Sequence, residues 1–342
     1  MTKLLLHIGS FRTGSTSTQF AFWSSRHRLR RMGILYPETG QVTKAHHELG
    51  LSLLGQEIEG CYQCPAFRPL LKSLAQEIAI SGCGTVLVST EVLMLLVDDK
   101  FGTEGKKERL EEFLSMFSEV RVICVLRHQA PLIESTFRFE VLGHDNLGQT
   151  VTESFPDYVR RWLEKPLLFY TTIEQAIRSV RPDLIFDFIS FASASQSGSL
   201  VRFVYECAGL VEAYCGEKRI NESQGRLGTL AILLRNRGEI VAKLGRPQFL
   251  RWSSLIDSNR GESLYDSALL LEVTAKFEAS NEELANRVGF NLNHELAAYE
   301  QKLRLSGSSL SSDELQGLKQ ALDHKIRHPL TSQVKEWLGF RF

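Results

Sequence analysis

Residues 3–20 read KLLLHIGSFRTGSTSTQF, and this stretch decides the fold. Its opening residues, 3–8, form a short apolar run that ends at Gly9, which predicts a buried β-strand. Residues 14–31 begin with small hydroxyl side chains and end before Gly33, which predicts a helix. A strand, a glycine-containing loop and a helix in direct succession predict the first unit of an α/β protein.

The loop between the predicted strand and helix carries chemistry of its own. Gly9 and Gly14 are five residues apart, as are the two glycines of G-x4-G-K-[ST]. Glycines let the backbone curl so that several N–H groups face one point, and the helix start adds roughly half a positive charge. With Arg12 nearby, the loop predicts a site for phosphate or a similar anion. The alternative is an ordinary βα turn with no ligand.

The same alternation of strands and helices continues along the chain. Further strands are predicted at 85–90, 120–126 and 184–189, and helices at 45–55, 67–80, 104–117, 129–142 and 198–208. This order predicts an α/β fold with a P-loop-type parallel sheet flanked by helices. After residue 225 helical patterns dominate, at 226–242, 263–288 and 291–304. We therefore expect an α/β domain over 1–225 and a mainly helical region over 226–342.

Composition excludes several classes of protein. The 342 residues contain 40 Lys and Arg against 40 Asp and Glu, which argues against a nucleic-acid binder. With 43% hydrophobic and 23% charged residues, the chain is expected to fold around a large core. No apolar run approaches the length of a membrane span, and three leucines are too few for a secretory signal. Six scattered cysteines are no disulfide scaffold, so a cytoplasmic location is expected.

Two smaller features qualify this picture. Residues 1–47 hold seven Lys and Arg against one acid, a local charge of +6 that the neutral total hides. Most of it falls on Arg26–Arg31, which we interpret as a solvated helix end. Cys61 and Cys64 form a C-x-x-C pair, but no second pair stands at zinc-ribbon spacing, so no metal site is expected.

A second candidate for anion binding follows the strand predicted at 120–126. Arg127 comes directly after this strand, at the edge where parallel sheets bind ligands. Ser135 stands eight residues later, about two turns into the helix that follows. An arginine fork and a hydroxyl at these positions can hold one phosphate group. Taken alone, an arginine after a strand is more often solvated.

Together, FRTGSTSTQ (residues 11–19) and LRHQAPLIES (residues 126–135) resemble the sulfotransferase family that uses 3′-phosphoadenosine 5′-phosphosulfate (PAPS). The resemblance covers residues 3–225 and is greatest to the bacterial carbohydrate-type enzymes. It implies a 5′-phosphosulfate loop made of Arg12, Thr13, Gly14, Ser15, Thr16 and Ser17. It also implies a 3′-phosphate element made of Arg127 and Ser135. Most members have Lys where this chain has Arg12, a wider and more delocalised cation.

A third, looser match lies at KRINES, residues 218–223. Family members often carry a basic R-x-N-x-S loop here, which implies that Arg219, Asn221 and Ser223 lie near the 3′-phosphate of the cofactor. A solvated loop is the alternative interpretation.

The resemblance implies transfer of a sulfuryl group from PAPS to a hydroxyl or amine of a carbohydrate, glycolipid or small metabolite, without a metal, leaving adenosine 3′,5′-bisphosphate. The acceptor then needs a general base. Glu91 is the favoured candidate because it follows the strand at 85–90, at the same sheet edge as Arg12 and Arg127. His46 and His47 are the rival candidates, since histidine titrates near neutrality.

Two other functions stay open. A P-loop kinase acting on a small metabolite would need Lys after Gly14, where this chain has Ser15, and a magnesium-binding Asp after a strand. A non-catalytic nucleotide-binding module would need neither. The helical region 226–342 is expected either to cover an acceptor cleft or to form a contact between subunits of a homo-oligomer.

Overall fold

A computed structural model describes residues 2–55, 66–98, 105–143, 150–216, 225–240, 245–255, 262–301 and 304–327. The chain divides into two compact units. The first unit comprises Met1–Leu132, Leu163–Glu222 and Lys276–Leu296, and the second comprises Ile133–Trp162, Ser223–Ala275 and Ala297–Phe342. The division into 1–225 and 226–342 stays a prediction.

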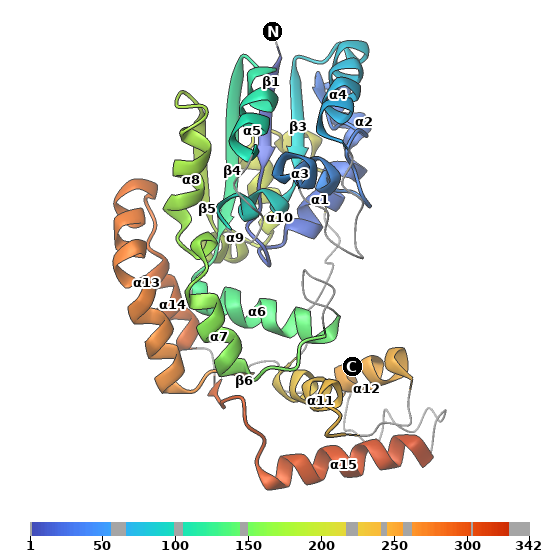
Figure 1. The fold of residues 1–342 in the computed structure, drawn as a ribbon, viewed down its shortest axis with the longest axis vertical. Helices are drawn as coiled ribbons and strands as arrows, with labels where there is room; N and C mark the ends of the chain where they lie inside the picture. Colours follow the sequence, from blue (N-terminus) through green and yellow to red (C-terminus); the bar gives the residue numbers. More distant parts are fainter. Residues whose placement is uncertain are drawn as a thin grey trace. The chain divides into compact units, whose positions relative to one another are not determined.

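The first unit is built around a five-stranded parallel sheet of the described residues (Figure 1). Its strands are β1 (Lys3–His7), β2 (Ile34–Leu35), β3 (Thr85–Ser89), β4 (Glu119–Leu126) and β5 (Ile185–Ser190). They lie in the order β2-β3-β1-β4-β5, so β1 is central, with β3 and β4 as its neighbours. The expected α/β fold with a parallel sheet is therefore confirmed. The carboxyl ends of β3, β1 and β4 lie side by side, which is where such sheets place ligands.

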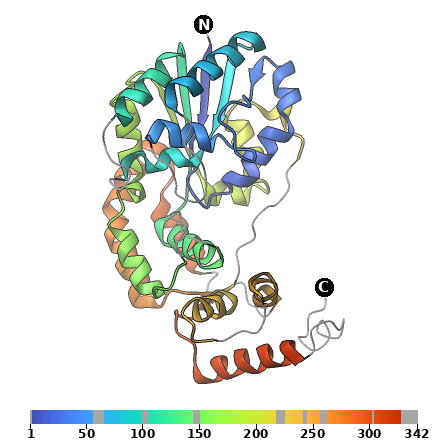
Figure 2. The ribbon, with the colours of Figure 1, turned by 45° about the vertical axis from the view of Figure 1, so that its right-hand side comes forward.

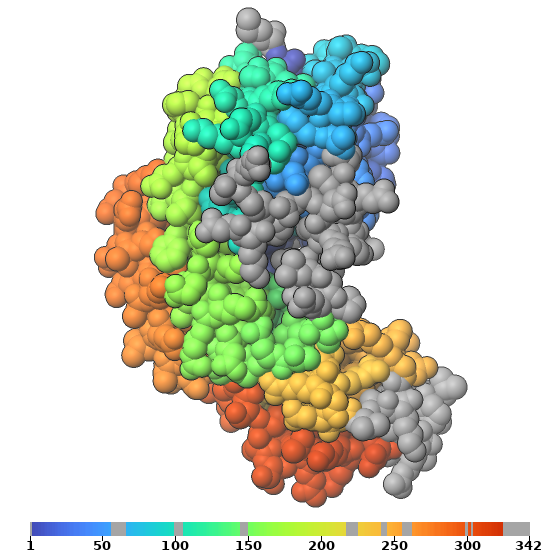
Figure 3. Space-filling model, viewed as in Figure 1, coloured from blue at the N-terminus to red at the C-terminus, as the bar shows by residue number. Residues whose placement is uncertain are grey.

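Helices cover both faces of this sheet (Figure 2). On one face, the apolar core joins the sheet to α1 (Ser15–Ser24), α2 (Arg26–Arg31), α9 (Phe191–Gln196) and α10 (Leu200–Cys207). On the other face lie α3 (His47–Leu54), α4 (Phe67–Ser81), α5 (Lys106–Ser115) and α8 (Tyr170–Arg178). Figure 3 shows side chains of α8, α5 and α4 on the surface of this unit. Burial on both faces explains why the strands are apolar almost throughout.

Two features depart from the sequence-based expectation. The helix predicted over 14–31 is interrupted at Ser25, whose hydroxyl donates to the carbonyl oxygen of Ala21 at 2.9 Å and lies 2.7 Å from the Tyr205 hydroxyl. A side-chain bond to the backbone of the preceding turn competes with helix continuation, so α2 starts as a separate helix. The structure also contains elements that no pattern predicted, among them β2, η1 (Glu91–Val97), η3 (Pro166–Leu168), η4 (Val211–Ala213), α8 and α9.

Four helices of the described residues have parts in both units. The first unit contains Lys276–Val288 of α13 (Ser267–Val288) and Leu292–Leu296 of α14 (Leu292–Glu300). Within this unit, the amide of Asn281 exchanges hydrogen bonds of 3.0 Å with the amide of Gln129. This buried polar pair fixes α13 to the start of α6 (Gln129–Leu142).

The second unit is mainly helical, as expected for the C-terminal region. Besides parts of α6, α13 and α14, it contains α7 (Phe155–Leu163) as far as Trp162, α11 (Arg226–Asn236), α12 (Arg246–Leu255), β6 (Glu262–Ser263), β7 (Arg304–Leu305) and α15 (Ser312–Arg327). The aromatic rings of Phe137, Phe155, Tyr158 and Tyr265 pack together in its core. Among the helices of the described residues, none combines the length and apolar character that a membrane crossing requires.

Candidate functional site

The loop that joins β1 to α1 has the left-handed backbone that its glycines allow. The φ angles of Gly9, Arg12 and Gly14 are 96°, 56° and 76°. The Thr13 hydroxyl closes the loop by donating to the carbonyl oxygen of Ser10 at 2.7 Å. Arg12 is one of two non-glycine residues with positive φ among the residues described, a conformation that costs about 1–2 kcal/mol. Such a cost at one residue of a curled loop points to a functional role for the loop.

Both glycines of the loop are needed for close packing. A Cβ atom on Gly14 would lie 2.4 Å from Cδ2 of Leu200, at the start of α10. A Cβ atom on Gly9 would lie 2.8 Å from Cβ of Glu91, at the start of η1. The loop is therefore held between two neighbouring elements. The contact with Glu91 brings the anion-binding candidate against the favoured general base.

The start of α1 offers backbone donors to an anion. Gly14 is the N-cap and no side chain caps the helix, which has no acidic residue in its first turn. The first N–H groups of a helix have no partner within the helix and carry its positive end. The predicted loop hydroxyls differ in exposure: Ser15 is buried, Ser17 is half-buried and Thr16 is exposed. The geometry suits an anion at the helix start.

The structure brings Arg127 to this loop. Nη1 of Arg127 lies 3.4 Å from the carbonyl oxygen of Arg12, 115 residues earlier in the chain. The guanidinium carbon lies 4.9 Å from the ring centroid of Phe191, in a cation–π contact. The backbone of Arg127 is fixed as well, because its carbonyl oxygen accepts a 2.5 Å hydrogen bond from the Tyr170 hydroxyl. Sequence reasoning missed Tyr170 and Phe191, since neither lies in a motif.

Glu91 lies between two polar side chains from other elements. Nε2 of Gln19, on α1, donates to Oε2 of Glu91 at 2.5 Å. Nε2 of His47, the first residue of α3, lies 3.9 Å from Oε1 of Glu91. Only 15% of the Glu91 side chain and 14% of the His47 side chain are exposed, so this polar group is largely shielded from solvent. Two of the predicted base candidates, Glu91 and His47, thus lie together.

His46 occupies a different environment from its neighbour. Its Nδ1 accepts a 3.1 Å hydrogen bond from the backbone N–H of Ser89, so the ring proton lies on Nε2, which donates to the carbonyl oxygen of Pro37 at 2.9 Å. Burial lowers the pKa of His46 to about 4. Because both nitrogens bind backbone groups, His46 joins the end of β3 to the loop that contains Pro37.

His7, in β1, is a second histidine whose pKa is lowered by burial. It is buried, its Nδ1 lies 2.8 Å from the Ser89 hydroxyl, and burial lowers its pKa to about 4. His7 is therefore a hydrogen-bonded residue of the core.

The remaining predicted residues are not placed with this group. Ser135 is a buried residue of α6 in the second unit, whereas Arg127 belongs to the first, so their joint action stays a prediction. Arg219, Asn221 and Ser223 lie outside the described residues, as do Cys61 and Cys64. Within the part of the chain that is described, no group of three or more His, Cys, Asp and Glu side chains is placed to hold a metal ion.

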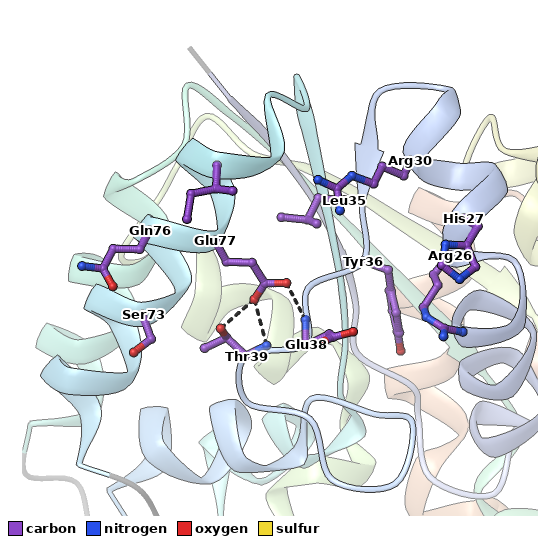
Figure 4. A pocket seen from close by; sticks show the side chains of 11 residues that line it. Arg26, His27, Arg30, Leu35, Tyr36, Glu38, Thr39, Ser73, Gln76 and Glu77 are labelled. Carbon is purple, nitrogen blue, oxygen red and sulfur yellow. Dashed lines mark hydrogen bonds between the residues drawn. The ribbon is translucent and has the colours of Figure 1, made fainter.

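A cavity of about 510 Å³ lies apart from these residues, between α2 and α4 beside β2 (Figure 4). Arg26 and Arg30 lie on one of its walls. On the other, the Glu77 carboxylate accepts from the backbone N–H groups of Glu38 and Thr39 at 2.7 and 2.9 Å. Through these hydrogen bonds, Glu77 holds the backbone at Glu38 and Thr39 in place. None of the predicted site residues lines this cavity.

No family model matches the chain, and neither a curated protein nor a solved structure is similar to it. Functional interpretation therefore depends on the residues and their geometry.

Proposed function

We propose that this chain is a PAPS-dependent sulfotransferase with a P-loop-type fold. The observation that carries the proposal is the 3.4 Å contact between Nη1 of Arg127 and the carbonyl oxygen of Arg12. It joins the two motifs that resemble this family at one edge of the sheet. Glu91, the candidate base, follows the adjacent strand at the same edge.

The residues of the loop fit an anionic cofactor. A curled backbone, an uncapped helix start and two arginines are donors and cations that suit phosphate and sulfate oxygens. We propose that the 5′-phosphosulfate binds at Arg12, Thr13, Gly14, Ser15, Thr16 and Ser17. We propose that the 3′-phosphate binds at Arg127, with Ser135, Arg219, Asn221 and Ser223 as further candidates.

PAPS, when bound, supplies an activated sulfuryl group. The protein's own contribution starts with electrostatics: Arg12 and the N–H groups at the start of α1 offset the negative charge that develops on the leaving phosphate. Arg127 holds the far end of the cofactor and thereby orients it. Glu91, with His47 beside it, removes the proton from the acceptor hydroxyl or amine. The acceptor class is a carbohydrate, a glycolipid or a small metabolite.

A P-loop kinase is the second candidate, because the loop geometry alone also suits a nucleotide phosphate. Two residues argue against it. Ser15 follows Gly14, where a kinase needs lysine, and Arg127 follows β4, where a magnesium-binding Asp is needed. A binding module without catalysis is the third candidate.

Ligand-induced thermal stabilisation separates these candidates. A ligand that binds only the folded chain raises the Tm. Adenosine 3′,5′-bisphosphate is expected to raise it in EDTA, whereas ATP with magnesium is expected to have a smaller effect. Stabilisation by ATP with magnesium alone would contradict the sulfotransferase proposal. Stabilisation by the bisphosphate, without transfer of labelled sulfate from PAPS to any of a panel of hydroxyl and amine acceptors, would favour the binding module.

A further inference from the structure

The two oxygens of the Glu91 carboxylate have different neighbours. Oε2 accepts the 2.5 Å hydrogen bond from the Gln19 side-chain amide, and Oε1 faces Nε2 of His47 at 3.9 Å. The side-chain nitrogen of Gln19 carries only donor hydrogens, and the Glu91 oxygen that faces it accepts. The hydrogen bond therefore runs from Gln19 to Glu91.

The surrounding backbone leaves this carboxylate little freedom. Gly9 approaches so closely that a Cβ atom there would lie 2.8 Å from Cβ of Glu91. On the other side, Gly50 of α3 allows a close approach to η1, because a Cβ atom at Gly50 would lie 2.7 Å from Oγ1 of Thr90. This approach places His47, in the first turn of α3, near Glu91. Gln19 is itself 3% exposed, so its amide is held in a packed site.

We propose that Gln19 is a positioning residue that fixes Oε2 of Glu91 and thereby directs Oε1 toward His47. A buried hydrogen bond to one oxygen limits rotation of the carboxylate, so the Glu91–His47 approach depends on the Gln19 donor. The contact itself is a feature of the folded chain. Its catalytic consequence rests on the proposed function, in which Glu91, with His47 beside it, removes the acceptor proton.

The contact can be tested without substrate or cofactor, through the imidazole of His47. In protein labelled with ¹³C at histidine Cε1, the His47 signal is identified by its loss in His47→Gln. Gln19→Met keeps a side chain of similar length but removes the donor. We expect Gln19→Met to shift the His47 signal, as we expect of Glu91→Gln. In protein that already carries Glu91→Gln, the added Gln19→Met substitution is expected to cause little further shift.

Gln129→Met is the matched control. Gln129 is also a buried glutamine of the first unit, and its amide donates to the carbonyl oxygen of Leu168 and to Asn281 instead. It is expected to leave the His47 signal in place while it lowers the Tm. If Gln19→Met does not fold, Gln19→Glu keeps the size of the side chain and replaces the donor with a second carboxylate, and it is expected to shift the His47 signal as well.

An unshifted His47 signal in the folded Gln19 variant would overturn the proposal, as would equal shifts in the Gln19 and Gln129 variants. Full additivity of the Gln19→Met and Glu91→Gln shifts would also overturn it. In turnover, Gln19→Met is expected to lower kcat about 10-fold or more with unchanged affinity for adenosine 3′,5′-bisphosphate. If the His47 signal shifts as expected but the bisphosphate does not bind wild-type protein, the positioning role stands and the sulfotransferase proposal fails.

Discussion

The side chain of Arg127 reaches the backbone of Arg12: Nη1 lies 3.4 Å from the Arg12 carbonyl oxygen. The two residues follow β4 and β1, which are adjacent parallel strands, and parallel strands end at the same sheet edge. Arg12 has positive φ, a conformation in which the contact with Arg127 helps to hold its carbonyl group. The relationship brings two short motifs, far apart in the chain, together at one edge of the sheet.

Arg127→Ala is expected to weaken binding of adenosine 3′,5′-bisphosphate by roughly 1.5–3 kcal/mol, the range for a hydrogen bond to a charged group. This corresponds to a Kd that is about 10-fold to 150-fold higher. Isothermal titration calorimetry measures the change. Arg202→Ala is the matched control, because it removes an arginine whose ion pair with Glu206 lies on the exposed side of α10. An equal change of Kd in both variants would show that Arg127 does not contact the bisphosphate.

Gly14→Ala is expected to lower stability by about 1–3 kcal/mol and to abolish bisphosphate binding. Two causes combine: φ is 76° at Gly14, and the new Cβ would lie 2.4 Å from Cδ2 of Leu200. Urea unfolding and ligand titration measure the two effects. At Gly84 no heavy atom would lie within 4 Å of a new Cβ, so Gly84→Ala is expected to retain both properties. Retained binding in Gly14→Ala would show that the curled loop does not bind the ligand.

Acid is expected to destabilise the fold through its buried histidines. Burial lowers the pKa of His7 and His46 to about 4 and that of His128 to about 3, against 6.5 in the unfolded chain. Below pH 6.5 the unfolded chain therefore binds more protons than the folded chain does. The contribution of these histidines to the free energy of unfolding is fully present above that pH and is lost as the pH falls toward 4. Each group contributes about 1.4 kcal/mol of loss per pH unit in this window.

Urea denaturation between pH 7 and pH 5 measures this slope. His7→Gln removes one of the three groups and is expected to reduce the slope by about one third. His27→Gln, at an exposed position of α2, is the control and is expected to leave the slope unchanged. A slope that is identical in wild type and His7→Gln would show that His7 is not buried in its neutral form.

Glu91→Gln is expected to reduce sulfate transfer by about 10²–10⁴-fold, the usual contribution of a general base. Bisphosphate affinity is expected to stay near that of the wild type, since Glu91 contacts Gln19 and His47 rather than the arginines. Single-turnover transfer from labelled PAPS measures the first quantity and calorimetry the second. Near-normal transfer in Glu91→Gln, together with loss in His47→Gln, would assign the base role to His47.

The four longer strands could be predicted from sequence because they are mostly apolar, and β1 and β3 also have glycines beside them. The run at 120–126 predicted β4 within one residue, and Gly9 marked the end of β1. The edge strand β2 has only two residues, too few to show a period, and it forms because β3 pairs with it. Local patterns cannot predict an element whose stability comes from a distant partner.

The candidate site was predictable only in part, for a related reason. His46 and His47 are adjacent and look alike in sequence, yet one is fixed by Ser89 and Pro37 while the other faces Glu91. Gln19 lies four residues after Ser15 in the quoted motif, but its partner Glu91 is 72 residues away. The motifs predict which loops bind an anion. Long-range packing determines which side chains meet beside them.

Calorimetric titration of wild-type protein with adenosine 3′,5′-bisphosphate, in EDTA, tests the central claim most directly. The account predicts saturable binding at a single site, which Arg127→Ala weakens and Arg202→Ala does not. Absence of binding to the wild-type protein would contradict it, and so would binding that Arg127→Ala leaves unchanged.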